Sequence, residues 1–106
     1  MIDIGNFEIQ LDTEDKELLM GLQHLYSTKA GERPLDREFG LDIDIIGMPM
    51  DVAKNEYAVE VIEKTERYEP RVEVEEVEFT YNAKEGKLFP KIKLVLLEDE
   101  EEEDGD

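Results

Sequence analysis

Two segments near the C-terminus alternate apolar and polar residues, and this alternation predicts two long β-strands at residues 72–81 and 87–97. The linker between them, residues 82–86, begins with Asn and ends with Gly, which predicts a hairpin turn. Pro90 lies inside the second segment. Because proline has no backbone N–H, we expect an edge position or a bulge for this strand.

The first of these strands changes parity along its length. Its apolar residues fall first on even and then on odd positions: Val72 and Val74, followed by Val77, Phe79 and Tyr81. A strand has a period of two and cannot absorb this change while keeping one face buried. The sequence therefore predicts a bulge or break near Glu75 and Glu76.

Helical spacing predicts a first helix after residue 13. Its buried positions are Leu18, Leu22 and Leu25. Thr13 is a suitable N-cap, and the acidic residues that follow it, Glu14, Asp15 and Glu17, suit the positive end of the helix dipole. Gly31 and Pro34 end this helical pattern.

A second helix is predicted at about residues 51–67, with its buried stripe formed by Ala58, Val61, Ile62 and Thr65. Pro70 disfavours helical dihedral angles at Glu69, so this helix should end by Tyr68. We interpret Met48, Pro49 and Met50 as packing at the start of the helix.

The order of these elements predicts the fold class. Phe7, Ile9 and Leu11 alternate with polar residues and predict a short strand or extended arm ahead of the first helix. Arm, helix, helix and hairpin together predict an α+β fold, with two main helices packed on one face of a small antiparallel sheet that contains the C-terminal β-hairpin. Residues 1–97 should form a single domain.

Charge excludes several classes of function. The 106 residues carry a formal net charge of −18, which argues against binding nucleic acid or an anionic membrane surface. Eight of the acidic residues lie in residues 98–106, which we predict to be a disordered acidic tail. The longest apolar run, residues 94–97, is too short to span a bilayer, and no signal-like segment is visible. We therefore expect a protein made in a cytoplasm.

Signals for chemistry are weak. There is no cysteine, and we interpret His24, the single histidine, as a partly buried or surface residue of the first helix rather than as a catalytic base for Ser27. Asp42 and Asp44 followed by Gly47 distantly suggest a calcium loop, but Ile46 occupies the position of the third ligand. We predict no catalytic residue, no metal site and no cofactor.

The corner formed by Glu69, Pro70 and Arg71 is more informative. Pro70 fixes its own φ and extends Glu69, so both charges project from a stiff junction between helix and strand. The planar fork of Arg71 suits a carboxylate or backbone carbonyls. The residues alone leave two interpretations open: an internal ion pair, or a rigid arginine that anchors a partner.

Three segments give the chain a family resemblance. They are residues 68–72 (Tyr-Glu-Pro-Arg-Val), residues 25–34 with Gly31, Glu32 and Arg33, and the Phe39-Gly40-Leu41 turn. In this order they resemble the baseplate wedge protein and sheath initiator family of contractile tails. That family includes small baseplate proteins of contractile phages, their tailocin relatives and a baseplate subunit of type VI secretion systems.

The resemblance implies a structural protein of the baseplate rather than an enzyme. Six copies would surround the tail tube, bind the wedge proteins through Glu69, Pro70 and Arg71, and initiate assembly of the sheath protein. Sheath contact would use strand addition on the hairpin, for which Val72, Val74, Lys91 and Lys93 are the candidate residues. No cofactor, nucleic acid, membrane or small-molecule substrate is implied. The protein would pass from the cytoplasm of the producing bacterium to the baseplate of the assembled particle, and the sequence leaves open whether that particle is a phage, a tailocin or a secretion system.

Two alternatives belong to other classes. Some members of the family carry a lysozyme-like label, so one alternative is a muramidase, which needs one carboxylic acid with a raised pKa and a second carboxylate across a cleft. The other is an acidic binding module that mimics nucleic acid. Deleting residues 98–106 separates it from an adaptor, because a mimic should lose its partner and an adaptor should still assemble.

Overall fold

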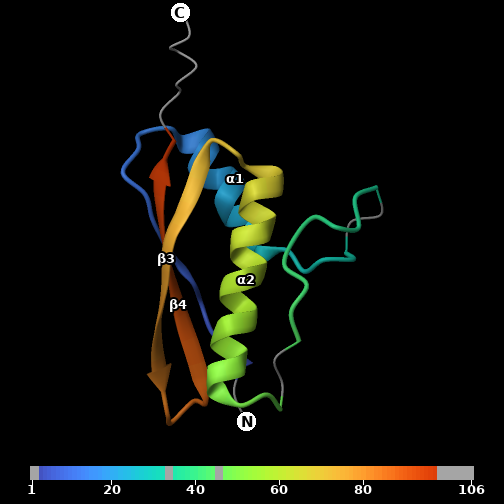
Figure 1. Ribbon diagram of the computed structural model, residues 1–106, viewed down its shortest axis with the longest axis vertical. Coiled ribbons are helices and arrows are strands. Elements are labelled where there is room, and N and C mark those ends of the chain that lie inside the picture. Colours follow the sequence, from blue (N-terminus) through green and yellow to red (C-terminus); the bar gives the residue numbers. More distant parts are fainter. Residues whose placement is uncertain (1–2, 33–34, 45–46, 98–106) are drawn as a thin grey trace, which may run out of the picture.

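The computed structural model describes residues 3–32, 35–44 and 47–97, and it has the predicted α+β fold (Figure 1). The predicted tail at 98–106 and the potential ligand position Ile46 lie outside the described residues. The elements in chain order are β1 (Asp3–Ile4), β2 (Glu8–Gln10), α1 (Lys16–Ser27), α2 (Met50–Tyr68), β3 (Val72–Asn82) and β4 (Lys87–Leu96). Both helices lie on one side of the sheet (Figure 1).

The sheet is mixed, which corrects the prediction of a wholly antiparallel sheet. β4 is the central strand: β3 pairs with it antiparallel, and β1 and β2 pair with its other edge in parallel. A parallel partner requires a long crossover, and α1, α2 and β3 together supply it. Alternation in the N-terminal arm predicted that a strand exists, but it carried no information about the direction of its neighbour.

Pro90 is not on an edge strand, so this alternative of the prediction is wrong. Its side chain is fully buried, and Phe79 of β3 lies opposite it. On the other side, β1 pairs with β4 as far as Leu88 and β2 begins at Lys91, so the ladder is interrupted opposite Pro90. This break accommodates a residue without an N–H in a central strand.

The predicted hairpin and its irregularity are confirmed. β3 and β4 pair from Val72 opposite Leu96 to Asn82 opposite Lys87, and the register shifts between Val74 and Glu76. In the turn, Gly86 N donates to the Asn82 carbonyl oxygen over 2.8 Å. The bulge lets apolar residues on both sides of the shift face the helices.

The N-cap of α1 is Asp15, which corrects the prediction of Thr13. Asp15 Oδ1 accepts a hydrogen bond from Leu18 N over 3.1 Å, while Thr13 Oγ1 accepts one from Asp15 N. Both side chains are good N-cap types, so propensity alone did not distinguish them. The helix begins where Leu18 reaches the core, and this selects Asp15.

The buried stripe of α2 confirms the prediction at Val61 and Thr65 and differs from it at the other two positions. It consists of Ala53, Tyr57, Val61 and Thr65, at a regular spacing of four residues. Ile62 is 39% exposed, and Ala58 is only partly buried. Hydropathy favoured Ile62, but the sheet lies on the side of Tyr57, whose ring packs edge-on against Phe79 at 5.9 Å.

The main core lies between the helices and the helix-facing side of the hairpin. Its buried members are Leu18, Leu22, Leu25, Tyr26, Leu41, Tyr57, Val61, Val72, Ile92 and Leu94. A smaller cluster around Ala53 and Leu88 includes Met48 and Met50, which confirms the predicted packing at the start of α2. The core thereby fixes the end of α2 against the start of β3, where the candidate site lies.

Candidate functional site

The corner between α2 and β3 is held by backbone hydrogen bonds on both sides. Glu69 N donates to Thr65 O over 2.8 Å and so ends the helix, and Val72 N donates to Glu69 O over 3.3 Å. Arg71 O accepts from Leu97 N over 2.9 Å, which ties the corner to the end of β4. The corner is therefore a fixed part of the fold rather than a free loop.

Arg71 is braced from within the chain and is still open to solvent. Its Nε donates to Glu69 Oε2 over 2.7 Å, and its Nη1 lies 3.8 Å from Asp15 Oδ2. The Glu69 side chain is only 16% exposed, whereas that of Arg71 is 60% exposed. The hydrogen bond with Glu69, followed by its charge, raises the pKa of Arg71 above its usual value. The two interpretations of this corner are compatible, because the internal ion pair orients a guanidinium that remains accessible.

Apolar surface adjoins the charged corner. Leu96 and Leu97, at the end of β4, are 46% and 47% exposed, and Pro70 is exposed as well. A shallow hollow of about 270 Å³ lies here, lined by Glu66, Pro70, Val72, Glu73 and Leu97. An exposed arginine beside apolar surface is a combination typical of protein interfaces.

The fold brings the three family-like segments together. Leu41 N donates to Thr28 O over 2.9 Å, which joins the segment after α1 to the Phe-Gly turn. The Phe39 ring then meets the Tyr68 ring edge-on at 5.1 Å, one residue before Glu69. Tyr68 also donates its hydroxyl proton to Asp36 Oδ1 over 2.9 Å. Of the second segment, Arg33 and Pro34 lie outside the described residues.

The residues predicted for strand addition fall in different places. Val72 is buried and Val74 packs against the core, so their side chains do not face a partner. Lys91 and Lys93 lie on the central strand and have neighbours on both sides. Among the described residues, β3 pairs with β4 alone, so β3 provides an edge of the sheet and β4 does not. The sequence predicted both hairpin strands as candidates and Pro90 as a mark of the edge; of the two, β3, the strand of Val72 and Val74, is the edge strand and β4 is not.

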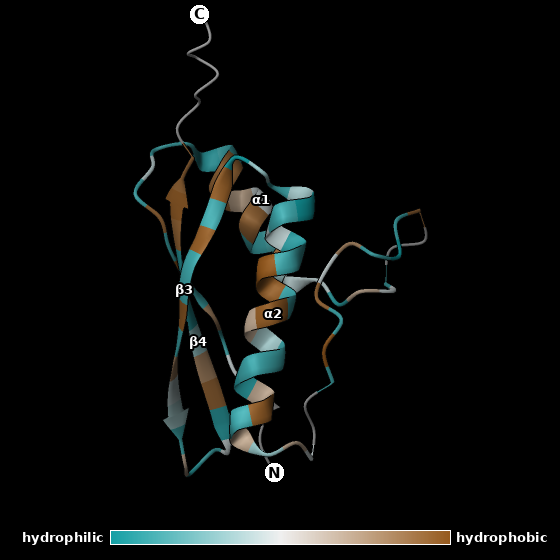
Figure 2. Cartoon of the chain, viewed as in Figure 1, coloured by the Kyte–Doolittle hydropathy of each residue, from teal (hydrophilic) through white to brown (hydrophobic). Residues whose placement is uncertain are grey.

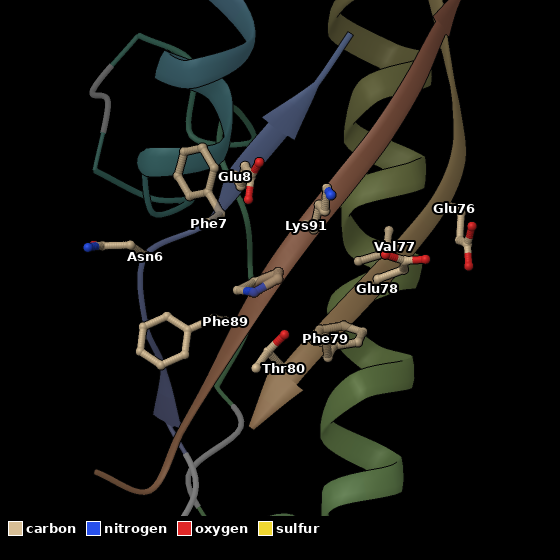
Figure 3. Close-up of a pocket in the computed structure, with 11 residues that line it drawn as sticks. Asn6, Phe7, Glu8, Glu76, Val77, Glu78, Phe79, Thr80, Phe89 and Lys91 are labelled. Carbon is tan, nitrogen blue, oxygen red and sulfur yellow. The ribbon is translucent and has the colours of Figure 1, made fainter. Parts of the chain in front are cut away.

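The face of the sheet away from the helices is hollowed, and side chains of both charges line the hollow (Figure 3). The hollow has a volume of about 750 Å³, and its lining includes Asn6, Glu8, Glu78, Phe89 and Lys91. In register, Lys91 lies between Glu8 of β2 and Glu78 of β3.

On this face of the sheet, Lys93 forms ion pairs with two glutamates of β3. Lys93 Nζ donates to Glu78 Oε2 over 3.0 Å and lies 3.7 Å from Glu76 Oε1. This hydrogen bond is the main reason that the pKa of Glu78 is lowered. A general acid of a muramidase needs the opposite shift, so Glu78 does not support that alternative.

The remaining polar candidates have local partners. Ser27 Oγ donates to the carbonyl oxygen of His24 over 3.3 Å, and the His24 ring lies 5.2 Å from that of Phe39. Within residues 3–32, 35–44 and 47–97, no group of three or more acidic or histidine side chains could hold a metal ion. In the same ranges, neither helix is long and apolar enough to cross a membrane.

A comparison of the sequence with models of known protein families found no match, and a comparison with curated proteins found none either. The candidate site therefore depends on its geometry and on the three segments described above.

Proposed function

We propose that this protein is a structural component of the baseplate of a contractile tail or injection machine. In this role it links the wedge proteins to the first ring of sheath subunits and initiates sheath assembly. The observation that carries the proposal is the state of Arg71, which Glu69 and Asp15 hold in place while most of its side chain stays exposed. The order of the three family-like segments, and their meeting at this corner, support the same role.

Glu69 preorganises Arg71 for binding to a partner. A free arginine loses rotamer entropy when it binds, and bracing by Glu69 removes part of that cost in advance. The exposed part of the guanidinium then suits a carboxylate or a group of carbonyls on the wedge. Pro70 and Leu97 add apolar area beside it, so the partner surface should combine an acidic or carbonyl-rich spot with apolar residues.

Sheath subunits would contact β3 by strand addition. Its outer edge has unpaired backbone groups in the described part of the chain, and exposed acidic residues along β3, Glu73, Glu75, Glu76 and Glu78, discourage pairing with unintended strands. Hydrogen exchange tests this assignment. Amides of β3 should gain protection when the sheath protein is added, and protection confined to other segments would rule it out.

The decisive experiment compares Arg71→Ala with Arg67→Ala in the native particle. Arg67 is a matched control because it is 58% exposed and pairs with Glu38, much as Arg71 pairs with Glu69. We expect Arg71→Ala to abolish intact, contractile particles with sheath, and Arg67→Ala to leave their yield unchanged. Normal yield with Arg71→Ala would show that the corner is not the wedge anchor.

A further inference from the structure

α2 has a second long face that stays exposed among the described residues. Val52, Val59 and Ile62 on this face are 44%, 41% and 39% exposed, although they are β-branched apolar residues. Val59 lies two positions from both Tyr57 and Val61, so at about 100° per residue it points away from the buried stripe. We define the outer face of α2 as Val52, Asn55, Glu56, Val59, Ile62, Glu63 and Glu66, all of which are exposed.

The apolar residues of the outer face are spaced as in a helix–helix seam. Val52 and Val59 are seven positions apart, and Ile62 follows three positions later. This is the a/d spacing of a heptad repeat, in which Asn55 occupies a d position. The three side chains extend over about 15 Å along the axis, at about 1.5 Å per residue. A second helix can follow such a seam, whereas an extended strand repeats every two residues and cannot.

The charges of the outer face have one sign. Its ionisable residues are Glu56, Glu63 and Glu66. The basic residues of α2 lie elsewhere: Lys64 and Arg67 contact Glu38, and the ammonium of Lys54 lies over the Phe79 ring. In the heptad frame Glu56 and Glu63 take e positions, which pair with charges on the partner helix.

We propose that the outer face of α2 is a docking surface for a basic amphipathic helix of another protein. The partner would place small or branched apolar residues against Val52, Val59 and Ile62, and Lys or Arg against Glu56 and Glu63. Charge excludes a second copy of this chain as the occupant. An antiparallel copy would bring Glu56 and Glu63 against their own equivalents, and a parallel copy would bring Asp51 near Glu56, between molecules that each carry −18. The apolar residues of this surface precede the corner at Arg71 along α2, and the outer face meets the hollow beside that corner at Glu66. The proposal goes beyond the proposed wedge and sheath contacts.

The test uses the full chain and a synthetic peptide of three heptads, with Val or Leu at a and d and Lys or Arg at e and g. We expect saturable binding in fluorescence anisotropy, with chemical-shift changes concentrated in α2 at residues 52–66. A scrambled peptide of the same composition should bind at least about tenfold more weakly, because it keeps the charge and lacks the seam. Equal binding of both peptides would show plain charge attraction and would overturn the proposal, as would shift changes centred on β3.

Two sets of variants, each with its control, distinguish the contribution of the apolar seam to peptide binding from that of charge. The double variant Val59→Ser, Ile62→Ser should weaken binding about tenfold. Its control is Met20→Ser, at a residue of α1 that is 69% exposed, and this change should leave binding unaltered. Glu56→Lys with Glu63→Lys should abolish binding. Glu14→Lys with Glu85→Lys makes the same change in net charge at exposed residues away from this face and should preserve most of the binding. If the control pairs weaken binding as much as the α2 pairs, the outer face is not the docking site. Circular dichroism melts verify that every variant is folded.

Discussion

Arg71 donates its Nε–H to Glu69 Oε2 over 2.7 Å, across a proline that keeps the two residues at fixed positions. Glu69 is the less exposed member of the pair and Arg71 the more exposed one. The carboxylate also lies beside α1, where one of its oxygens is 3.9 Å from the position that a Cβ on Gly21 would occupy. Glu69 thus acts inside the fold to orient Arg71, and the arginine is the residue that a partner can reach.

Loss of the Glu69 charge should weaken wedge binding less than loss of the Arg71 side chain does. In Glu69→Gln the side chain keeps its shape but loses its charge, so Arg71 is oriented less firmly. We expect wedge binding to weaken about two- to fivefold, the range typical of an exposed ion pair. Arg71→Ala should remove binding altogether. Titration of the purified wedge partner measures both variants, and equal losses would mean that Glu69 itself contacts the partner.

Gly40 should tolerate substitution less well than Gly31. Both residues have positive φ, 103° and 97°, so alanine is strained at either position and should cost about 1 kcal/mol in the free energy of unfolding. At Gly40 a Cβ would also lie 2.5 Å from the carbonyl oxygen of Thr28, while nothing lies within 4 Å at Gly31. We expect Gly40→Ala to cost at least about twice as much as Gly31→Ala in urea denaturation. Equal costs would contradict the close approach.

Tyr26, one of two tyrosines in the core, should make the fold sensitive to alkali. Thr65 Oγ1 donates its single proton to Val61 O, so the 2.6 Å contact between Tyr26 and Thr65 has the Tyr26 hydroxyl as donor. Burial raises the pKa of Tyr26 from 10.0 to about 12. The unfolded chain releases this proton first, so the stabilisation is complete below pH 10 and is lost as the pH rises toward 12.

Tyr26→Phe tests this pH dependence. Two pKa units correspond to about 3 kcal/mol in the free energy of unfolding, so the variant should lose about that much less than the wild type between pH 10 and 12. At pH 7 it should be less stable by about 1 kcal/mol, because the hydrogen bond with Thr65 is gone. Denaturant melts at several pH values give both numbers. Parallel losses in the two proteins above pH 10 would show that Tyr26 is not the group responsible.

Truncation of two adjacent residues of α2 should change the free energy of unfolding by very different amounts. Val61 is fully buried, and Val61→Ala should cost about 2 kcal/mol in the free energy of unfolding. Ile62 is 39% exposed, and Ile62→Ala should change stability by no more than about 0.5 kcal/mol. Thermal denaturation distinguishes them, and a large loss at Ile62 would restore the stripe that hydropathy predicted.

The ion pair between Lys93 and Glu78, on the face of the sheet away from the helices, should contribute to stability in a pH-dependent way. The hydrogen bond from Lys93 lowers the pKa of Glu78, so its contribution is present above the usual pKa of 4.5 and is lost as the pH falls through the lowered value. Glu78→Gln should therefore be less stable than the wild type at pH 7, and the difference should shrink with acidification. A difference that stays constant down to pH 2 would show that the pair is not its origin.

Local rules were sufficient for several elements because the necessary information lies within a few residues. Parity located the bulge near Glu75, and Pro70 located the end of α2 at Tyr68. The stiffness of the Glu69-Pro70-Arg71 corner was predicted in the same way. Each of these features depends on the steric properties of adjacent residues, which the sequence specifies directly.

Tertiary structure decided the features that depend on residues far apart in the chain. Parallel pairing of β1 and β2 with β4 placed Pro90 in a central strand. Of the two hairpin strands that the sequence offered for strand addition, this leaves β3 as the edge. The side of α2 that is buried was fixed by where the sheet lies, not by hydropathy, and this left Val59 and Ile62 exposed. The side of α2 that Figure 2 shows carries both apolar and polar residues, so the hydropathy of this helix is compatible with more than one buried face. Sequence by itself determined where the chain turns and which residues can pair, because those depend on local sterics; which partners they find was decided by packing.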